Sequence, residues 1–148
     1  KQRMQTIEKF SDDGKKTETT EYSYKPDGSY TIENTDTRYG MKNIDIFDTK
    51  GLQLSRTIPD GSVYHYVYNN KKQLIKMYSE PKNGGLEFTN EYTYNSAGKL
   101  ISKINKGEYA STSVYEYGAK GLLKKNTITS GNDAEEKEIT VYAYEYDY

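Results

Sequence analysis

Polar and apolar residues alternate in short runs along most of the chain, and each run ends at a cluster of turn residues. Six clusters share one pattern, an aromatic residue followed by three turn residues and then Gly or Lys. They occupy residues 10–14, 24–28, 47–51, 68–72, 94–98 and 117–121. The aromatic residues lie 14, 23, 21, 26 and 23 residues apart, and most of these spacings fit two short strands and two turns. The pattern predicts one β-hairpin per repeat.

The number of turns predicts an all-β fold, an antiparallel meander of roughly ten to twelve short strands. A sheet of this many strands rarely stays flat. We therefore expect it to be strongly twisted and to curl on itself, with a sandwich or an open barrel as the alternative. No stretch shows the helical period of about 3.6 residues. At 148 residues the chain is expected to form a single domain, residues 1–148.

The turn residues predict a specific hairpin geometry. In residues 25–28, Lys-Pro-Asp-Gly, proline suits the first turn position and glycine suits the left-handed residue that closes the turn. Gly98 and Gly121 end turns of the same length, so both are expected to have a positive φ. Lys72 occupies the same position and has to enter the left-handed region at some energetic cost.

The turn length also predicts which side chains face each other across each hairpin. The residue four before the closing position lies opposite the residue two after it, which pairs Tyr24 with Tyr30, Tyr68 with Leu74, Tyr94 with Leu100, and Tyr117 with Leu123. Because side chains alternate, the tyrosines two residues earlier share the same face and form a tyrosine ladder. The leucine partners favour a ladder that forms the core, and an exposed ladder is the alternative. Between about residues 63 and 104 both faces are partly apolar, so a cover over the second face is expected there.

Composition excludes several classes of partner. Basic and acidic residues nearly balance, 21 against 22, with a net charge of −1, so nucleic acid is not an expected partner. No apolar run reaches the roughly 18–20 residues that cross a bilayer, so no membrane span is expected. The absence of Cys excludes disulfides and thiolate chemistry.

The composition favours an exported protein. The sequence starts at Lys1 without Met and is rich in Tyr, Thr, Ser, Asn and Lys. We expect a periplasmic, lipid-anchored surface or secreted protein whose signal segment has been removed.

Few residues suggest catalysis. His65 is the only His, and it has neither a Cys nor a serine nucleophile motif to serve. The carboxylates gather at residues 12–13, 45 and 48, and 133–136 without a calcium-loop spacing, which favours turn caps and solvated charges. No cofactor, no metal site and no enzymatic activity are predicted.

The repeat resembles a known bacterial family. Residues 92–100, Tyr-Thr-Tyr-Asn-Ser-Ala-Gly-Lys-Leu, and the terminal Tyr-Glu-Tyr-Asp of residues 144–147 are similar to the Tyr-Asp repeats of RHS-type proteins. That resemblance implies a spiralling β-strip and cell-surface contact. The chain is also similar to small exported families of unknown function in Bacteroides-type bacteria, which implies export.

Tyrosine rings stack on sugars and anchor protein interfaces, so the ladder is the feature that suggests a function. The same turn rule places Tyr66 opposite Lys76, Tyr92 opposite Ser102 and Tyr115 opposite Lys125. We therefore predict that the three tyrosines form an exposed strip with Lys76 and Lys125 beside it. The predicted function is non-enzymatic recognition of a glycan or a protein; the alternative is a carbohydrate-active enzyme that uses a carboxylate pair.

Overall fold

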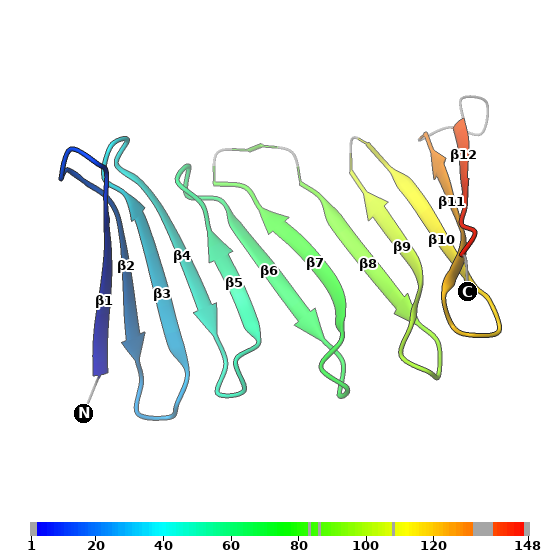
Figure 1. Ribbon diagram of the computed structural model, residues 1–148, viewed down its shortest axis with the longest axis horizontal. Helices are drawn as coiled ribbons and strands as arrows, with labels where there is room; N and C mark the ends of the chain where they lie inside the picture. The colour runs from blue at the N-terminus through cyan, green and yellow to red at the C-terminus, as the bar shows by residue number, and fades with distance from the viewer. Residues whose placement is uncertain (1–2, 83, 86, 108, 132–137, 147–148) are drawn as a thin grey trace. The chain divides into compact units, whose positions relative to one another are not determined.

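The computed structural model describes residues 3–82, 84–85, 87–107, 109–131 and 138–146, and within these ranges it contains twelve strands and no helix (Figure 1). The strands are β1 Arg3–Phe10, β2 Lys16–Tyr24, β3 Tyr30–Asp36, β4 Met41–Phe47, β5 Gln53–Thr57, β6 Val63–Tyr68, β7 Leu74–Glu80, β8 Thr89–Tyr94, β9 Leu100–Lys106, β10 Ser111–Tyr117, β11 Leu123–Ser130 and β12 Glu138–Ala143.

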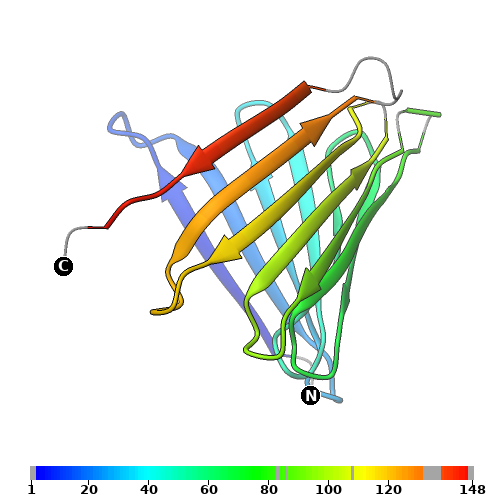
Figure 2. The same cartoon turned by 90° about the vertical axis from the view of Figure 1, so that its right-hand side faces the viewer.

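The strands form one antiparallel sheet in which they follow one another in sequence order from β1 to β12. The predicted all-β meander is therefore confirmed, and the sheet is not closed into a barrel. The chain divides into two compact units, which we describe separately. Unit 1 comprises residues 1–67 and 79–85, and unit 2 comprises residues 68–78 and 86–148. Figure 2 shows β9 to β12 of unit 2 lying side by side in that order. The single-domain assignment stays a prediction.

The hairpin turns have the geometry expected from the repeat. In the turn after β2, the Lys25 N–H donates to Ser29 O at 2.8 Å and the Gly28 N–H donates to Lys25 O at 3.0 Å. The same pair of bonds closes the other five repeat turns and the turn at residues 58–62. Gly98 and Gly121 have φ of 80° and 73°, as predicted. Lys72 has φ of 63°, and no other non-glycine residue in the described ranges has a positive φ.

The strand register confirms three predicted pairs and corrects two. Tyr24 faces Tyr30, Tyr94 faces Leu100 and Tyr117 faces Leu123. The pair of Tyr68 with Leu74 stays a prediction. Bulges directly after the turns then shift the register by one residue. Their effect is that Tyr92 lies opposite Lys103 rather than Ser102, and Tyr115 opposite Asn126 rather than Lys125.

No apolar side chain in the described part of the chain is buried, so the prediction that the tyrosines form a core is wrong. Most tyrosines within the strands are half-buried. Val67, which was expected to lie under a cover, is 40% exposed. The well-buried side chains are polar ones, Asp45, Ser79 and Asn90.

In unit 2, side chains join each repeat to the next; we call these bonds the repeat ladder. The residue after the turn-closing Gly or Lys donates forward to the next turn, from Gln73 Nε2 to Gly98 O at 3.0 Å and from Lys99 Nζ to Gly121 O at 2.5 Å. The aromatic anchor donates backward, from Tyr94 Oη to Leu74 O at 2.9 Å and from Tyr117 Oη to Leu100 O at 2.8 Å. The Tyr and Lys positions of the repeat therefore hold neighbouring hairpins together.

Candidate binding face of unit 1

One face of unit 1 begins, at the turn end of its strands, with a row of aromatic rings. Tyr24, Tyr30 and Phe47 occupy opposing positions on β2, β3 and β4. The rings of Tyr30 and Phe47 stack with centroids 4.7 Å apart, and those of Tyr24 and Tyr30 lie 5.5 Å apart. Each ring is half-buried, so the row offers partly exposed aromatic surface on one side of the sheet.

The next row of this face contains an ion pair whose carboxylate is buried. Ile32, Asp45, Arg56 and Tyr64 follow one another across β3 to β6. The Asp45 side chain is only 7% exposed and accepts hydrogen bonds from Gln53 Nε2 at 2.6 Å and from Arg56 Nη2 at 3.1 Å. Arg56 Nε also lies 2.9 Å from Asp45 Oδ1. Two contacts to one carboxylate hold the guanidinium in a defined orientation, while 44% of the Arg56 side chain remains exposed.

Tyr66 belongs to the same face, because it lies two residues after Tyr64 on β6 and every second side chain of a strand points to the same side. Burial raises the pKa of its phenol, and the carboxylate of Asp45 raises this pKa further, whereas the guanidinium of Arg56 lowers it. The ring is therefore neutral over the physiological range and acts as a hydroxyl donor or acceptor rather than as an anion.

Beyond these rows the face becomes polar and is hollowed. The hollow has a volume of about 410 Å³. Among the residues that line it, seven side chains belong to the tyrosine face: the apolar Met41 and the polar Glu18, Thr20, Asn34, Asp36, Asn43 and Arg56. Thr20, Asn34 and Asn43 form one row across β2, β3 and β4, and Thr20 Oγ1 donates to Asn34 Oδ1 at 2.8 Å. We refer to this site as the polar hollow.

Two carboxylates stand opposite each other at the far side of the hollow, Glu18 on β2 and Asp36 on β3. Each already has a basic partner, because Glu18 lies 2.5 Å from Lys9 Nζ and Asp36 lies 2.8 Å from Arg38 Nη2. The hydrogen bond from the Arg38 side chain holds the pKa of Asp36 below its usual value of 3.8. Asp36 is therefore an anion and a hydrogen-bond acceptor at neutral pH.

Within unit 2, the two lysines of the predicted strip do not share a face with the tyrosines next to them. Lys76 pairs with Glu91, the neighbour of Tyr92 on β8, so Lys76 lies on the face opposite to Tyr92. Its ammonium instead lies 5.1 Å from the ring centroid of Tyr78. The register of β7 against β8 is the physical reason, because it sets Glu91 rather than Tyr92 opposite Lys76.

Lys125 is displaced from the predicted strip in the same way. It pairs with Glu116, the neighbour of Tyr115 on β10, and its Nζ lies 3.3 Å from that carboxylate. Lys125 and Tyr115 therefore occupy opposite faces of unit 2. The rings of Tyr66, Tyr92 and Tyr115 are half-buried. Their role in ligand binding stays a prediction.

The remaining sequence candidates for catalysis or metal binding are His65 and the clustered carboxylates. His65 Nε2 lies 3.2 Å from Glu80, across strands of unit 1. In the described ranges, no group of three or more His, Asp or Glu residues could hold a metal ion. The acidic cluster at residues 133–136 lies outside these ranges. The part of the chain that the structure describes holds no apolar helix of the length that crosses a membrane.

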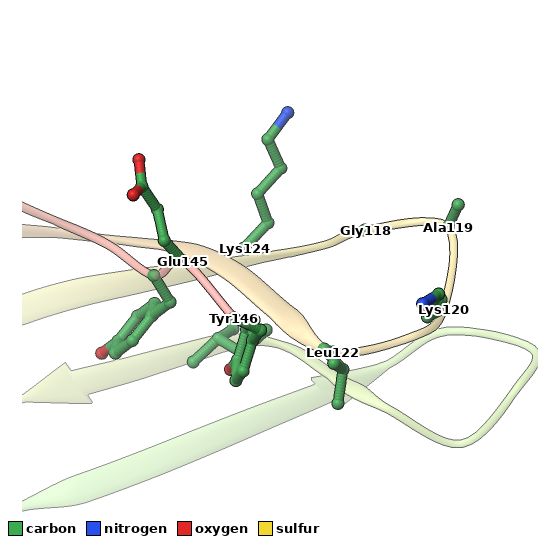
Figure 3. A pocket seen from close by; sticks show the side chains of 9 residues that line it. Gly118, Ala119, Lys120, Leu122, Lys124, Glu145 and Tyr146 are labelled. Atoms are coloured by element: carbon green, nitrogen blue, oxygen red, sulfur yellow. The ribbon is translucent and has the colours of Figure 1, made fainter. Parts of the chain in front are cut away.

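Unit 2 contains a second hollow of about 470 Å³, formed by the turn at residues 118–122 and the segment after β12. Figure 3 shows the side chains of Leu122 and Tyr146 on one side of the ribbon and those of Lys124 and Glu145 on the other. The Tyr144 N–H donates to Lys124 O at 3.0 Å, so this segment continues the pairing of β12 with β11. Tyr144 and Tyr146 repeat the spacing of Tyr92 and Tyr94 and stand where a further repeat would begin.

The sequence analysis did not identify the polar row of the hollow, although the alternation of side chains along each strand places these residues on the tyrosine face. Thr20 lies two residues before Tyr22 and therefore shares its face. No protein-family model and no curated protein matches the chain. The resemblance to Tyr-Asp repeat proteins stays a prediction.

Proposed function

We propose that the tyrosine-bearing face of unit 1 is a non-catalytic binding site for an uncharged glycan. The observation that carries the proposal is the polar hollow, which adjoins rows of aromatic side chains on the same sheet face. Its volume of about 410 Å³ falls within the range of about 300–1,000 Å³ that is common for ligand sites. We further propose an exported protein, because polysaccharides are encountered mainly outside the cytoplasm.

The chemistry of the lining matches that of a sugar. Sugar hydroxyls both donate and accept hydrogen bonds, and the hollow offers amides at Asn34 and Asn43, the guanidinium of Arg56 and the carboxylate of Asp36. Apolar faces of sugar rings stack on aromatic side chains, which Tyr22 and Tyr64 supply in the adjoining row. The acidic groups of the hollow have basic partners at Lys9 and Arg38, which favours an uncharged ligand over a strongly charged one.

The Asp45–Arg56 pair contributes by preorganisation. Because the buried carboxylate fixes the guanidinium, Arg56 loses little further freedom when a ligand binds. Binding is expected to be weakened even by changes that leave Arg56 in place but remove its support at Asp45.

A carbohydrate-active enzyme is the alternative, with Glu18 and Asp36 as the carboxylate pair. Such an enzyme needs one carboxyl group that is protonated near neutral pH and one that is ionised, and the lowered pKa of Asp36 fits only the ionised role. Glu18 would then have to be the acid, but its side chain forms an ion pair with Lys9 at 2.5 Å. We therefore favour binding without turnover. The alternative predicts release of shorter sugars from any glycan that binds.

A glycan array followed by calorimetry on the best ligand tests the proposal. Asn34→Ala and Asn43→Ala are each expected to weaken binding by on the order of tenfold, as for loss of one or two ligand hydrogen bonds. Thr31→Ala is the matched control, because Thr31 lies on β3 but on the opposite face. The folding of each variant is checked by circular dichroism. The proposal would be overturned if no glycan binds, or if Thr31→Ala loses as much binding affinity as the asparagine variants. Chromatography of the glycan after incubation with the protein tests the enzyme alternative, because it reveals any hydrolysis.

A further inference from the structure

Both outer strands of the sheet leave one edge without a neighbour in the described part of the chain. On β12, Ile139 is 64% exposed and Val141 is 53% exposed. On β1, Ile7 is 46% exposed and Phe10 is 59% exposed. Unpaired N–H and C=O groups on such edges recruit further strands by main-chain hydrogen bonding. The exposed apolar side chains add surface that a neighbouring strand would cover.

The hydrogen bonds of the last hairpin identify the outward-facing groups of β12. The Tyr144 N–H donates inward to Lys124 O, and N–H groups alternate in direction along a strand. The N–H and C=O of Val141 therefore point away from β11, toward the free edge. On β1, the Ser11 N–H donates to Lys15 O and the Thr17 hydroxyl donates to Lys9 O, so the same alternation directs the main-chain groups of Thr6 outward.

The two edges carry opposite charge. Residues 3–10 contain two basic side chains and one acidic side chain, whereas residues 138–146 contain two acidic side chains and no basic one. Two β12 edges or two β1 edges would bring like charges together, which disfavours symmetric pairing. A β12 edge beside a β1 edge brings unlike charges together. In addition, β1 following β12 continues the alternation of strand directions that the meander already has.

We propose that copies of this chain associate head to tail, with β12 of one copy pairing antiparallel with β1 of the next. The interface joins two different surfaces, so each added copy leaves a new free β1 and a new free β12. The products are open chains whose length depends on protein concentration. The hollow lined by Leu122, Tyr144 and Tyr146 lies at the end of the β12 edge, beside the start of the added strand.

Two proline variants test the pairing. Val141→Pro removes an outward N–H from β12, and Thr6→Pro removes one from β1, while the inward bonds to β11 and β2 are retained. Sedimentation of the full chain is expected to show a mass that rises with protein concentration and falls with added salt. Each proline variant alone is expected to remain monomeric, and circular dichroism checks that each is folded.

Mixing the two variants gives the decisive result. Val141→Pro retains an intact β1 edge and Thr6→Pro retains an intact β12 edge, so an equimolar mixture is expected to form a dimer that grows no further. Val114→Thr, which alters an exposed side chain on the interior strand β10, is the matched control and should associate like the unaltered protein. A protein that stays monomeric at all concentrations overturns the proposal. So does association that survives in either single variant, including a symmetric dimer formed by Thr6→Pro.

Discussion

A single backbone position, the residue that closes each hairpin turn, shows how local chemistry shapes this fold. Glycine accepts a positive φ at almost no cost, whereas a residue with a Cβ is strained there. Five repeat turns have Gly at this position and one has Lys72, with φ of 63°. The left-handed conformation of Lys72 could be predicted from the sequence, because five consecutive residues determine both the length of the turn and the position that closes it.

Lys72→Gly should therefore stabilise the protein. We expect the free energy of unfolding to rise by about 0.5–1 kcal/mol, since relief of the left-handed strain exceeds the entropic cost of a new glycine. Lys71→Gly in the same turn is the control and should be neutral or slightly destabilising, because its φ is not positive. Urea unfolding measures both values. A lower stability for Lys72→Gly would show that the Lys72 side chain makes a compensating contact.

The Gly98 position allows the opposite experiment. Gly98→Val forces a β-branched residue to φ near 80°, and its Cβ would lie 3.3 Å from Gln73 Nε2, a donor of the repeat ladder. We expect a loss of about 1–2 kcal/mol in the free energy of unfolding. The same substitution at exposed Ala97, one residue earlier in the turn, serves as the comparison. An unchanged melting midpoint for Gly98→Val would contradict the turn geometry.

Asp36 gives a pH-dependent prediction at the same scale. Its pKa is lowered from 3.8 chiefly by the hydrogen bond from Arg38, so it stabilises the folded state above 3.8 and loses that contribution as the pH falls through the folded-state pKa. Asp36→Asn should therefore lower the melting temperature at neutral pH, and the difference should vanish in acid. Arg38→Gln should reproduce the effect, and the double variant should add little. A difference that persists in acid would assign the loss to packing instead.

At the scale of the hairpin, the sequence predicted which strands pair but not their full register. The pairs next to each turn follow from turn length, so Tyr94 opposite Leu100 could be predicted. The extra residue of the bulge leaves no clear signal, since Ile101 reads like any apolar strand residue. That single residue moved Tyr92 from Ser102 to Lys103, and a separate bulge in the next hairpin moved Tyr115 from Lys125 to Asn126.

The repeat ladder predicts that neighbouring hairpins are energetically coupled. Lys99→Met removes the bond to Gly121 O and the cation–π contact with the Tyr117 ring, and Tyr117→Phe removes the bond to Leu100 O. Each single change should cost about 0.5–1.5 kcal/mol. The double variant should lose less than the sum, because both hydrogen bonds join the same two neighbouring hairpins. Lys124→Met, on an exposed position of β11, should have little effect in the same denaturation experiment.

At the scale of the whole molecule, the alternation of polar and apolar residues along the strands could not predict how deeply the side chains are buried. An alternating strand with tyrosine on one face reads the same whether a second layer covers that face or neighbouring side chains shield it from the sides. The structure favours the second situation within each unit, because the described apolar side chains include none that is buried. Of the three buried polar residues Asp45, Ser79 and Asn90, Asp45 is the least exposed, and it contacts Gln53 and Arg56. The most buried site in the described ranges is therefore filled by polar contacts rather than by apolar packing.

A sheet without a core has a thermodynamic signature. The heat capacity change of unfolding reports mainly on newly exposed apolar surface, and the usual value of about 12–15 cal/mol/K per residue amounts to about 2 kcal/mol/K for a chain of this length. We expect a clearly smaller value and a shallow dependence of stability on temperature. Calorimetry on Val141→Pro makes the measurement free of any contribution from association between copies. A heat capacity change at or above the usual value would mean that substantial apolar surface is buried, and the tyrosine face would then be a covered core rather than a surface for ligands.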